Sequence, residues 1–148
     1  MVTLLDVNVL VALFDPNHIH HLTAHDWFAE TRGQGWVTCP LTENGLIRVL
    51  SNPRYPGRRT TVDDSAQRLR MFCESDQHQF WEDSLSVLDG SVQTPHIQGH
   101  RQVTDVYLLA LAVARGGRLV TFDAAMSIAA VRNATPAHLI VLGMTERG

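Results

Sequence analysis

Four acidic residues in or beside apolar segments are the side chains of this chain best suited to chemistry. Asp6 and Asp123 end the apolar runs 2–5 and 119–122, Asp105 opens the apolar segment 106–114, and Glu43 lies one turn into a predicted helix. A carboxylate beside a core is costly unless it has a partner. Two carboxylates ~4 Å apart at an effective dielectric of about 20 repel by roughly 4 kcal/mol. Four that converge would therefore need a cation to stay ionised.

Oxygen ligands of this kind suit a hard divalent ion, Mg²⁺ or Mn²⁺. Such an ion makes hydroxide available near neutral pH by lowering the pKa of a bound water. It also neutralises charge on a phosphoryl oxygen. The chemistry expected of a converged quartet is therefore hydrolysis of phosphodiesters by a metal-activated water.

Each acid taken alone also has a plainer explanation. An aspartate at a strand end often begins a turn or caps the next helix. Asp105 can simply be a first-turn acid that gains roughly 0.3–1 kcal/mol from the helix N-terminus. Glu43 can be a solvated helix position. The metal hypothesis depends on all four meeting at one edge of one sheet.

Alternating strands and helices could bring about that meeting. We predict strands at 2–7, 36–39, 118–122 and 138–142, and helices at 9–14, 18–32, 40–50, 62–75 and 102–115. Residues 79–81 are a short strand or edge, 84–88 a helical turn, and a short helix follows Asp123. Asn8 and Thr104 are the expected caps of their helices, and Pro40 suits a first turn.

This alternation predicts an α/β fold, a three-layer sandwich with a central, mostly parallel sheet. Such sheets bind ligands outside the carboxyl ends of their strands, where Asp6 and Asp123 are expected. The helix over 102–115 is apolar nearly all round, so it is either central or part of a dimer interface. Trp27, Trp36 and Trp81 are expected in the core or an interface.

Composition narrows the classes of function. The 148 residues fit one domain, 1–148, and the net charge of −3 implies no global attraction to nucleic acid. All 12 basic residues are Arg, so the lysine of a P-loop nucleotide hydrolase is missing. Cys39 and Cys73 form no metal-spaced pair and are expected to be free thiols. We find neither a signal-peptide pattern nor a run long enough to span a membrane, and expect a cytoplasmic protein.

The ordered set of motifs resembles a PIN domain, and within that family the VapC-type toxins of bacterial toxin–antitoxin pairs. The matching motifs are Asp6-x-Asn8, Thr42-Glu43 with Arg48, Thr104-Asp105, Thr121-Phe122-Asp123, and the segment 49–55 that follows the Glu43 helix. Single motifs such as D-x-N are weak, but the ordered set spans nearly the whole chain.

This resemblance implies a metal-dependent endoribonuclease that cleaves cellular RNA such as tRNA or rRNA. It also implies a cognate VapB-type antitoxin and a homodimer. By the match, Asp6, Glu43, Asp105 and Asp123 are the catalytic and metal-binding acids, with Mg²⁺ or Mn²⁺ as cofactor. Asn8 is expected to orient Asp6, and the Thr121 hydroxyl to hold a metal water. A helix cap and an ordinary β-branched strand residue are their alternatives.

A basic loop is the second candidate surface. Arg54, Arg58 and Arg59 with Tyr55 could grip phosphates and stack on a base, could contact an acidic antitoxin segment, or could form a plain solvated loop. Arg48 either approaches a bound phosphate or a carboxylate, or is a surface residue.

A group of histidines and two alternative functions also have to be considered. The four histidines at positions 18, 20, 21 and 25 gather near one helix start, but no ligand set at closed zinc spacing accompanies them. A PIN-fold module that binds RNA or a partner without cutting is the alternative function. A structure-specific DNA nuclease on the same fold is a third, for which 148 residues leave little room.

Overall fold

Five parallel strands form one sheet with the order β3-β2-β1-β4-β5. The structure, a computed structural model, describes residues 1–143. The strands are short: β1 (Thr3–Leu5), β2 (Trp36–Thr38), β3 (His78–Phe80), β4 (Arg118–Thr121) and β5 (Leu139–Val141). Because all neighbours run parallel, every strand delivers its carboxyl end to the same edge.

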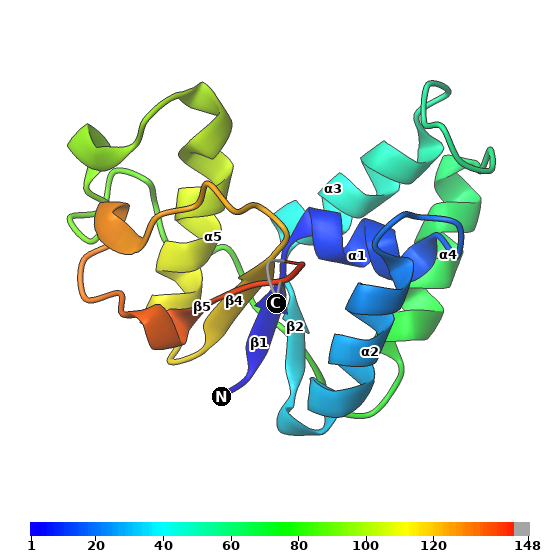
Figure 1. Cartoon of the computed structure of the whole chain (residues 1–148), viewed down its shortest axis with the longest axis horizontal. Coiled ribbons are helices and arrows are strands. Elements are labelled where there is room, and N and C mark those ends of the chain that lie inside the picture. Colours follow the sequence, from blue (N-terminus) through cyan, green and yellow to red (C-terminus); the bar gives the residue numbers. More distant parts are fainter. Residues whose placement is uncertain (144–148) are drawn as a thin grey trace.

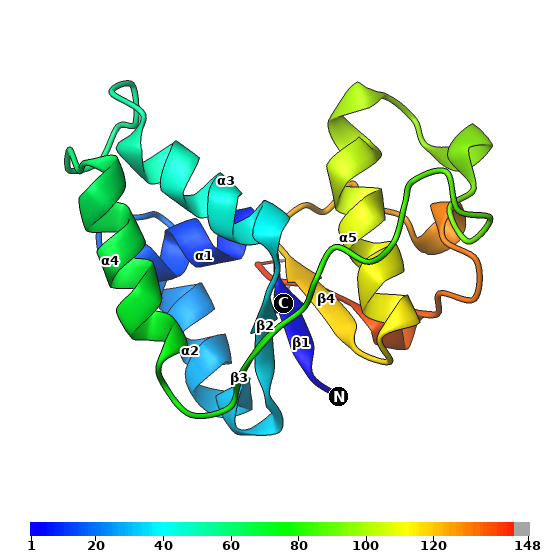
Figure 2. The same ribbon diagram turned by 180° about the vertical axis from the view of Figure 1, so that it is seen from behind.

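Helices cover both faces of this sheet, which confirms the predicted α/β/α layering (Figure 1). One face carries α1 (Val7–Phe14), α2 (His21–Thr31), α3 (Pro40–Ser51) and α4 (Val62–Cys73). The other face carries α5 (Val103–Ala114), and the view from behind shows α5 and α3 on opposite sides of the strand ends (Figure 2).

The two faces of the sheet bury separate apolar clusters. Leu5, Trp36 and Val120 pack with α1 to α4, whereas Leu4 and Leu119 pack with α5. Successive strand residues point to opposite faces, so each strand feeds both clusters alternately. The α5 helix is central, since residues 106–112 are all buried.

A close contact holds α3 beside the first residue of α1. A Cβ at Gly45 would lie 2.5 Å from Cγ2 of Val7, so only glycine permits this approach. Pro40 takes the first helical turn as expected, and the backbone N–H of Cys39 donates to the Thr42 hydroxyl at 3.0 Å. The first half of α3 is therefore held against the start of α1.

Several local predictions were wrong. Asp6, not Asn8, caps α1, because the strand ends early enough for its carboxylate to accept from the Val7 N–H at 2.7 Å. The N-cap of α5 is Gln102, not Thr104, and it makes no side-chain bond. The second helix begins at His21 rather than His18, since residues 18–20 form turns.

The loops after the strands also differ from expectation. Residues 84–88 form no helical turn, and after Asp123 the chain makes a turn before a short 3₁₀ helix, Ile128–Ala130. The Asp123 carboxylate explains the second case, because it accepts from the Ala125 N–H and so favours a turn. Among residues 1–143, no helix is long and apolar enough to cross a membrane.

Candidate active site at the carboxyl ends of the strands

The Thr121 hydroxyl joins three of the predicted site residues. It donates to Oδ2 of Asp6 at 2.7 Å and accepts from the side-chain amide of Asn8 and the backbone N–H of Asp123, each at 3.1 Å. Asn8 in turn accepts the Phe122 N–H through its side-chain oxygen. The first residues of α1 and the last of β4 are thus tied together where the sheet ends.

Asp6 is fixed in one orientation. Its side chain is buried at 4% exposure, one carboxylate oxygen accepts from the Val7 N–H and the other from Thr121. Burial raises the pKa of Asp6, the two hydrogen bonds oppose that rise, and the nearby charge of Asp123 adds to it. Asp6 is thus an ionisable group in a place that disfavours its ionised form.

Asp105 lies in the first turn of α5, half-buried, and completes the group. Burial, the charge of Asp6, and a carboxyl–carboxyl contact with Asp123 raise the pKa of Asp105 to about 7. The structure therefore brings Asp6, Asp105 and Asp123 together from three segments distant in sequence. We call these three the aspartate cluster.

Glu43 points elsewhere. Its carboxylate accepts a hydrogen bond of 2.7 Å from the hydroxyl of Thr38, the last residue of β2. The same hydroxyl lies 2.8 Å from Nε2 of His78 on β3. No hydrogen bond within residues 1–143 joins Glu43 to the aspartate cluster.

Strand alternation explains the separation. Val120 packs on the α1–α4 face, so Thr121 faces α5 and draws Asp6 to that side. Trp36 packs on the α1–α4 face, and Thr38, two residues on, faces the same way. The two hydroxyls, at the ends of β4 and β2 on either side of β1, therefore hold two carboxylates over opposite faces.

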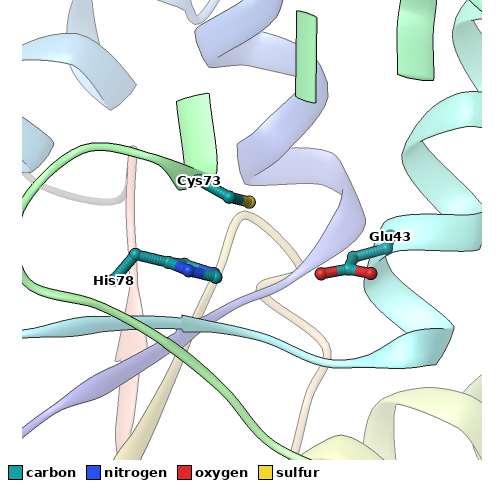
Figure 3. A group of neighbouring side chains, drawn as sticks. All are labelled: Glu43, Cys73 and His78. Carbon is teal, nitrogen blue, oxygen red and sulfur yellow. The ribbon is translucent and has the colours of Figure 1, made fainter. Parts of the chain in front are cut away.

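The neighbours of Glu43 form a second group that sequence reasoning missed. Ligand atoms of Glu43, Cys73 and His78 all lie within 4.8 Å of one another, from α3, α4 and the start of β3 (Figure 3). Burial raises the pKa of the Cys73 thiol and lowers that of His78. The spacing Cys-x₄-His was a usable signal, but nothing in the sequence linked it to Glu43.

The basic loop lies over another part of the α1–α4 layer. Arg58, Arg59 and Tyr55 line a pocket of about 530 Å³ between the end of α1 and α4, together with Asp15 and Arg68. The Tyr55 hydroxyl donates to Asp15 at 2.6 Å. Burial, together with this bond, raises the tyrosine pKa, and the bond lowers the pKa of Asp15.

The other two arginines of this candidate surface, Arg48 on α3 and Arg54 in the loop, are exposed. The structure gives neither a side-chain partner among residues 1–143. Both are free to reach a phosphate.

The histidine group forms no metal site within residues 1–143. His20 stacks on Phe122 with ring centroids 4.7 Å apart, which places it beside the end of β4. Nδ1 of His21 lies 2.7 Å from the Ala12 carbonyl, and Nδ1 of His18 accepts the His20 N–H. These histidines brace the connection between α1 and α2.

Charge balance decides what the aspartate cluster can hold. Within residues 1–143 the one ion pair joins His25 and Asp26, so no basic side chain neutralises the cluster. Asp6 is nevertheless deeply buried, and each of its oxygens keeps a further lone pair. An all-oxygen donor set without a cationic neighbour fits a hard divalent ion.

Comparison with known proteins agrees with this geometry. Residues 3–132 match the PIN domain family. The chain is 43% identical over 143 residues to the ribonuclease VapC44 of Mycobacterium tuberculosis, covering 96% of this chain and 100% of the relative. It is 44% identical over 128 residues to the ribonuclease VapC39 of the same organism, covering 86% and 92%.

Solved structures show the same fold at low sequence identity. VapC20 of Mycobacterium tuberculosis, a toxin that cleaves the sarcin–ricin loop, superposes with a TM-score of 0.58 at 14% identity, covering 90% of this chain and 99% of that one. The VapBC2 complex of Rickettsia felis, bound to a fragment of promoter DNA, gives 0.59 at 14% identity, covering 83% and 88%. With the family match and these relatives, the chain belongs to the PIN-domain family and, within it, to the VapC ribonucleases.

Proposed function

We propose that this protein is a Mg²⁺- or Mn²⁺-dependent endoribonuclease, the toxin of a toxin–antitoxin pair. The observation that carries the proposal is the aspartate cluster: three carboxylates of distant segments at one sheet edge, with no basic partner among the described residues. The names of the relatives supply the substrate class, RNA.

Asp6, Asp105 and Asp123 would hold the ion, with Glu43 as the fourth ligand. When bound, the ion would neutralise charge on a phosphoryl oxygen and lower the pKa of a water molecule. To join the cluster, Glu43 must leave the Thr38 hydroxyl. Its helix packs at Gly45 against Val7, the residue that follows Asp6.

Asp6 and Asp105 would have different roles in the reaction. Asp6 is held by two hydrogen bonds and provides a fixed anchor. Asp105 receives no hydrogen bond from an N–H or hydroxyl group of residues 1–143, so its carboxylate is free to accept one from the attacking water. We assign the orientation of that water to Asp105, which is the more exposed of the two.

The partners follow from the same reasoning. Arg48, Arg54, Arg58 and Arg59 are exposed cations that would contact RNA phosphates or an acidic segment of a VapB-type antitoxin. Tyr55 lines the same pocket as Arg58 and Arg59, while its hydroxyl stays on Asp15. A homodimer and a cytoplasmic location complete the proposal, and one domain over residues 1–148 remains part of it.

The direct test is cleavage of cellular RNA by purified protein. We expect cleavage with Mg²⁺ or Mn²⁺ and none with EDTA. Asp6→Asn or Asp105→Asn should each lower the rate by about 10²–10³-fold, as expected when a preorganised electrostatic group is lost. Asp63→Asn, an exposed aspartate on α4, is the matched control.

Equal cleavage by the wild type and Asp105→Asn would contradict the assignment. Binding of RNA without cleavage under any metal condition would favour a non-catalytic PIN-fold module. Cleavage of DNA in preference to RNA would favour the DNA nuclease instead.

A further inference from the structure

The group formed by Glu43, Cys73 and His78 lies outside the aspartate cluster and has a different chemistry. Figure 3 shows the three side chains converging from α3, the end of α4 and the start of β3. All three are half-buried, so the space they enclose is shielded from bulk water without being sealed. The Thr38 hydroxyl, fully buried, contacts two of them.

The type of ligand argues against Mg²⁺ here. A thiolate and an imidazole are borderline-soft ligands that select Zn²⁺ and other transition metals, whereas Mg²⁺ requires oxygen. One Cys, one His and one carboxylate are the ligand types that Zn²⁺ accepts, and three protein ligands leave a fourth position for water. The aspartate cluster offers oxygen alone.

The geometry needs little adjustment. Zn–S and Zn–N bonds of about 2.3 and 2.0 Å at a tetrahedral angle separate neighbouring ligand atoms by about 3.5 Å. The ligand atoms already lie within 4.8 Å of one another, so each side chain has to move by roughly an ångström or less. The four-residue turn between Cys73 and His78 keeps their spacing short, and Gln77 in it has φ 73°.

Two further features favour a cation at this place. Glu43 is a half-buried carboxylate with no ion-pair partner among residues 1–143. The Thr38 hydroxyl already orients it, as hydrogen-bonded neighbours orient metal ligands in known sites.

We propose that Glu43, Cys73 and His78 form a second metal site, selective for Zn²⁺ over Mg²⁺. The site joins the start of α3 and the end of α4 to the edge strand β3. If the proposed function is correct, Zn²⁺ bound here also keeps Glu43 away from the aspartate cluster and slows cleavage. That consequence rests on the proposed function, whereas the site itself does not.

Cobalt spectroscopy tests the site independently of nuclease activity. Co²⁺ replaces Zn²⁺ and, when bound to a thiolate, produces a sulfur-to-metal charge-transfer band in the near ultraviolet that oxygen ligands do not produce. Full-length, metal-free protein titrated with Co²⁺ should develop this band up to one equivalent. Zn²⁺ should abolish it, and a large excess of Mg²⁺ should leave it unchanged.

Variants locate the thiolate. Cys73→Ser should lose the band, and His78→Gln should bind Co²⁺ at least about tenfold more weakly, because even neighbours of metal ligands contribute about 10–100-fold. Cys39→Ser and Asp105→Asn should keep it, which separates this site from the other thiol and from the aspartate cluster. The melting temperature of each variant without metal shows whether it is folded.

A band that persists in folded Cys73→Ser, or none in the wild type, would overturn the proposal. So would a band that Mg²⁺ displaces as readily as Zn²⁺. A nuclease that fails to cut RNA yet shows the cobalt band would leave this site standing and remove only the proposed function.

Discussion

Two carboxylate sites at one sheet edge differ in what surrounds the charge. On the α5 face, Asp6, Asp105 and Asp123 face one another, and burial together with mutual repulsion raises the pKa of Asp105 to about 7. On the α4 face, Glu43 has a hydroxyl, a thiol and an imidazole for neighbours. The first site concentrates like charge, and the second mixes ligand types.

The contrast shows that the face toward which a strand-end hydroxyl points decides which carboxylate it holds, and so which type of site forms there. The donors Thr121 and Thr38 end β4 and β2, the two strands that flank β1, but they face opposite layers. Each hydroxyl donates a hydrogen bond to the carboxylate that lies on its own side of the sheet. The all-oxygen cluster fits a hard ion, and the mixed group fits a softer one.

After the loss of an aspartate of the cluster itself, the largest expected effect comes from disturbing the hydrogen bonds that orient Asp6. Asn8→Ala removes the amide that holds the Thr121 hydroxyl and the Phe122 N–H. We expect a loss of about 10–100-fold in RNA cleavage, typical for residues that orient metal ligands. The cobalt band should be unchanged.

Asn17→Ala is the matched control, since Asn17 is exposed in the loop after α1. Full activity in Asn8→Ala would show that Thr121 holds Asp6 without help.

Glu43 is the residue that the two sites would share. Glu43→Gln should weaken both readouts, lowering cleavage and Co²⁺ affinity each by about tenfold, because it removes one charged ligand from either set. Asp105→Asn, by contrast, should lower cleavage alone. The measurements are the cleavage rate with saturating Mg²⁺ and the cobalt titration.

Glu30→Gln, an exposed glutamate on α2, is the control for the loss of a charge. If Glu43→Gln alters one readout and not the other, Glu43 belongs to one site only.

The smallest effect expected is on stability as a function of pH. In metal-free protein the raised pKa of Asp105 means that the folded state binds its proton more tightly than the unfolded state does. The free energy of unfolding should therefore fall as pH rises from about 4, the unfolded value, to about 7. Asp6, whose pKa burial also raises, acts in the same direction.

Thermal melts across this range, with EDTA and with Mg²⁺, measure the effect. Asp105→Asn should flatten the decline relative to the wild type, and Mg²⁺ should oppose it because the ion binds the ionised form. Identical pH profiles for the wild type and Asp105→Asn would mean that the cluster is not under electrostatic strain.

Local patterns predicted most elements of this fold because their signals lie within a few residues. Pro40 marked a helix start and the apolar stretch after Asp105 marked a buried helix, and both are observed. The N-cap residues of the helices were harder to predict, because the choice between Asp6 and Asn8 depends on where the preceding strand ends. That point is set by pairing with β4, which lies more than a hundred residues away.

The composition of the site was predicted better than its arrangement. Side-chain type and order along the chain indicated four acids and a metal-dependent hydrolase, and strand ends placed Asp6 and Asp123 at one edge. The direction of Glu43 was not predictable, because it depends on which face Thr38 presents and on His78 from a strand forty residues away.

The sequence by itself determined which elements form and which side chains can carry charge, since hydrophobic periodicity and residue type are local properties. Only the tertiary structure decided which of those charges meet. Strand order and the alternation of side chains along each strand brought Asp6, Asp105 and Asp123 to one face. They placed Glu43 beside Cys73 and His78 on the other face. The physical reason is that a sheet has two faces, and the partners available on each come from segments distant along the chain.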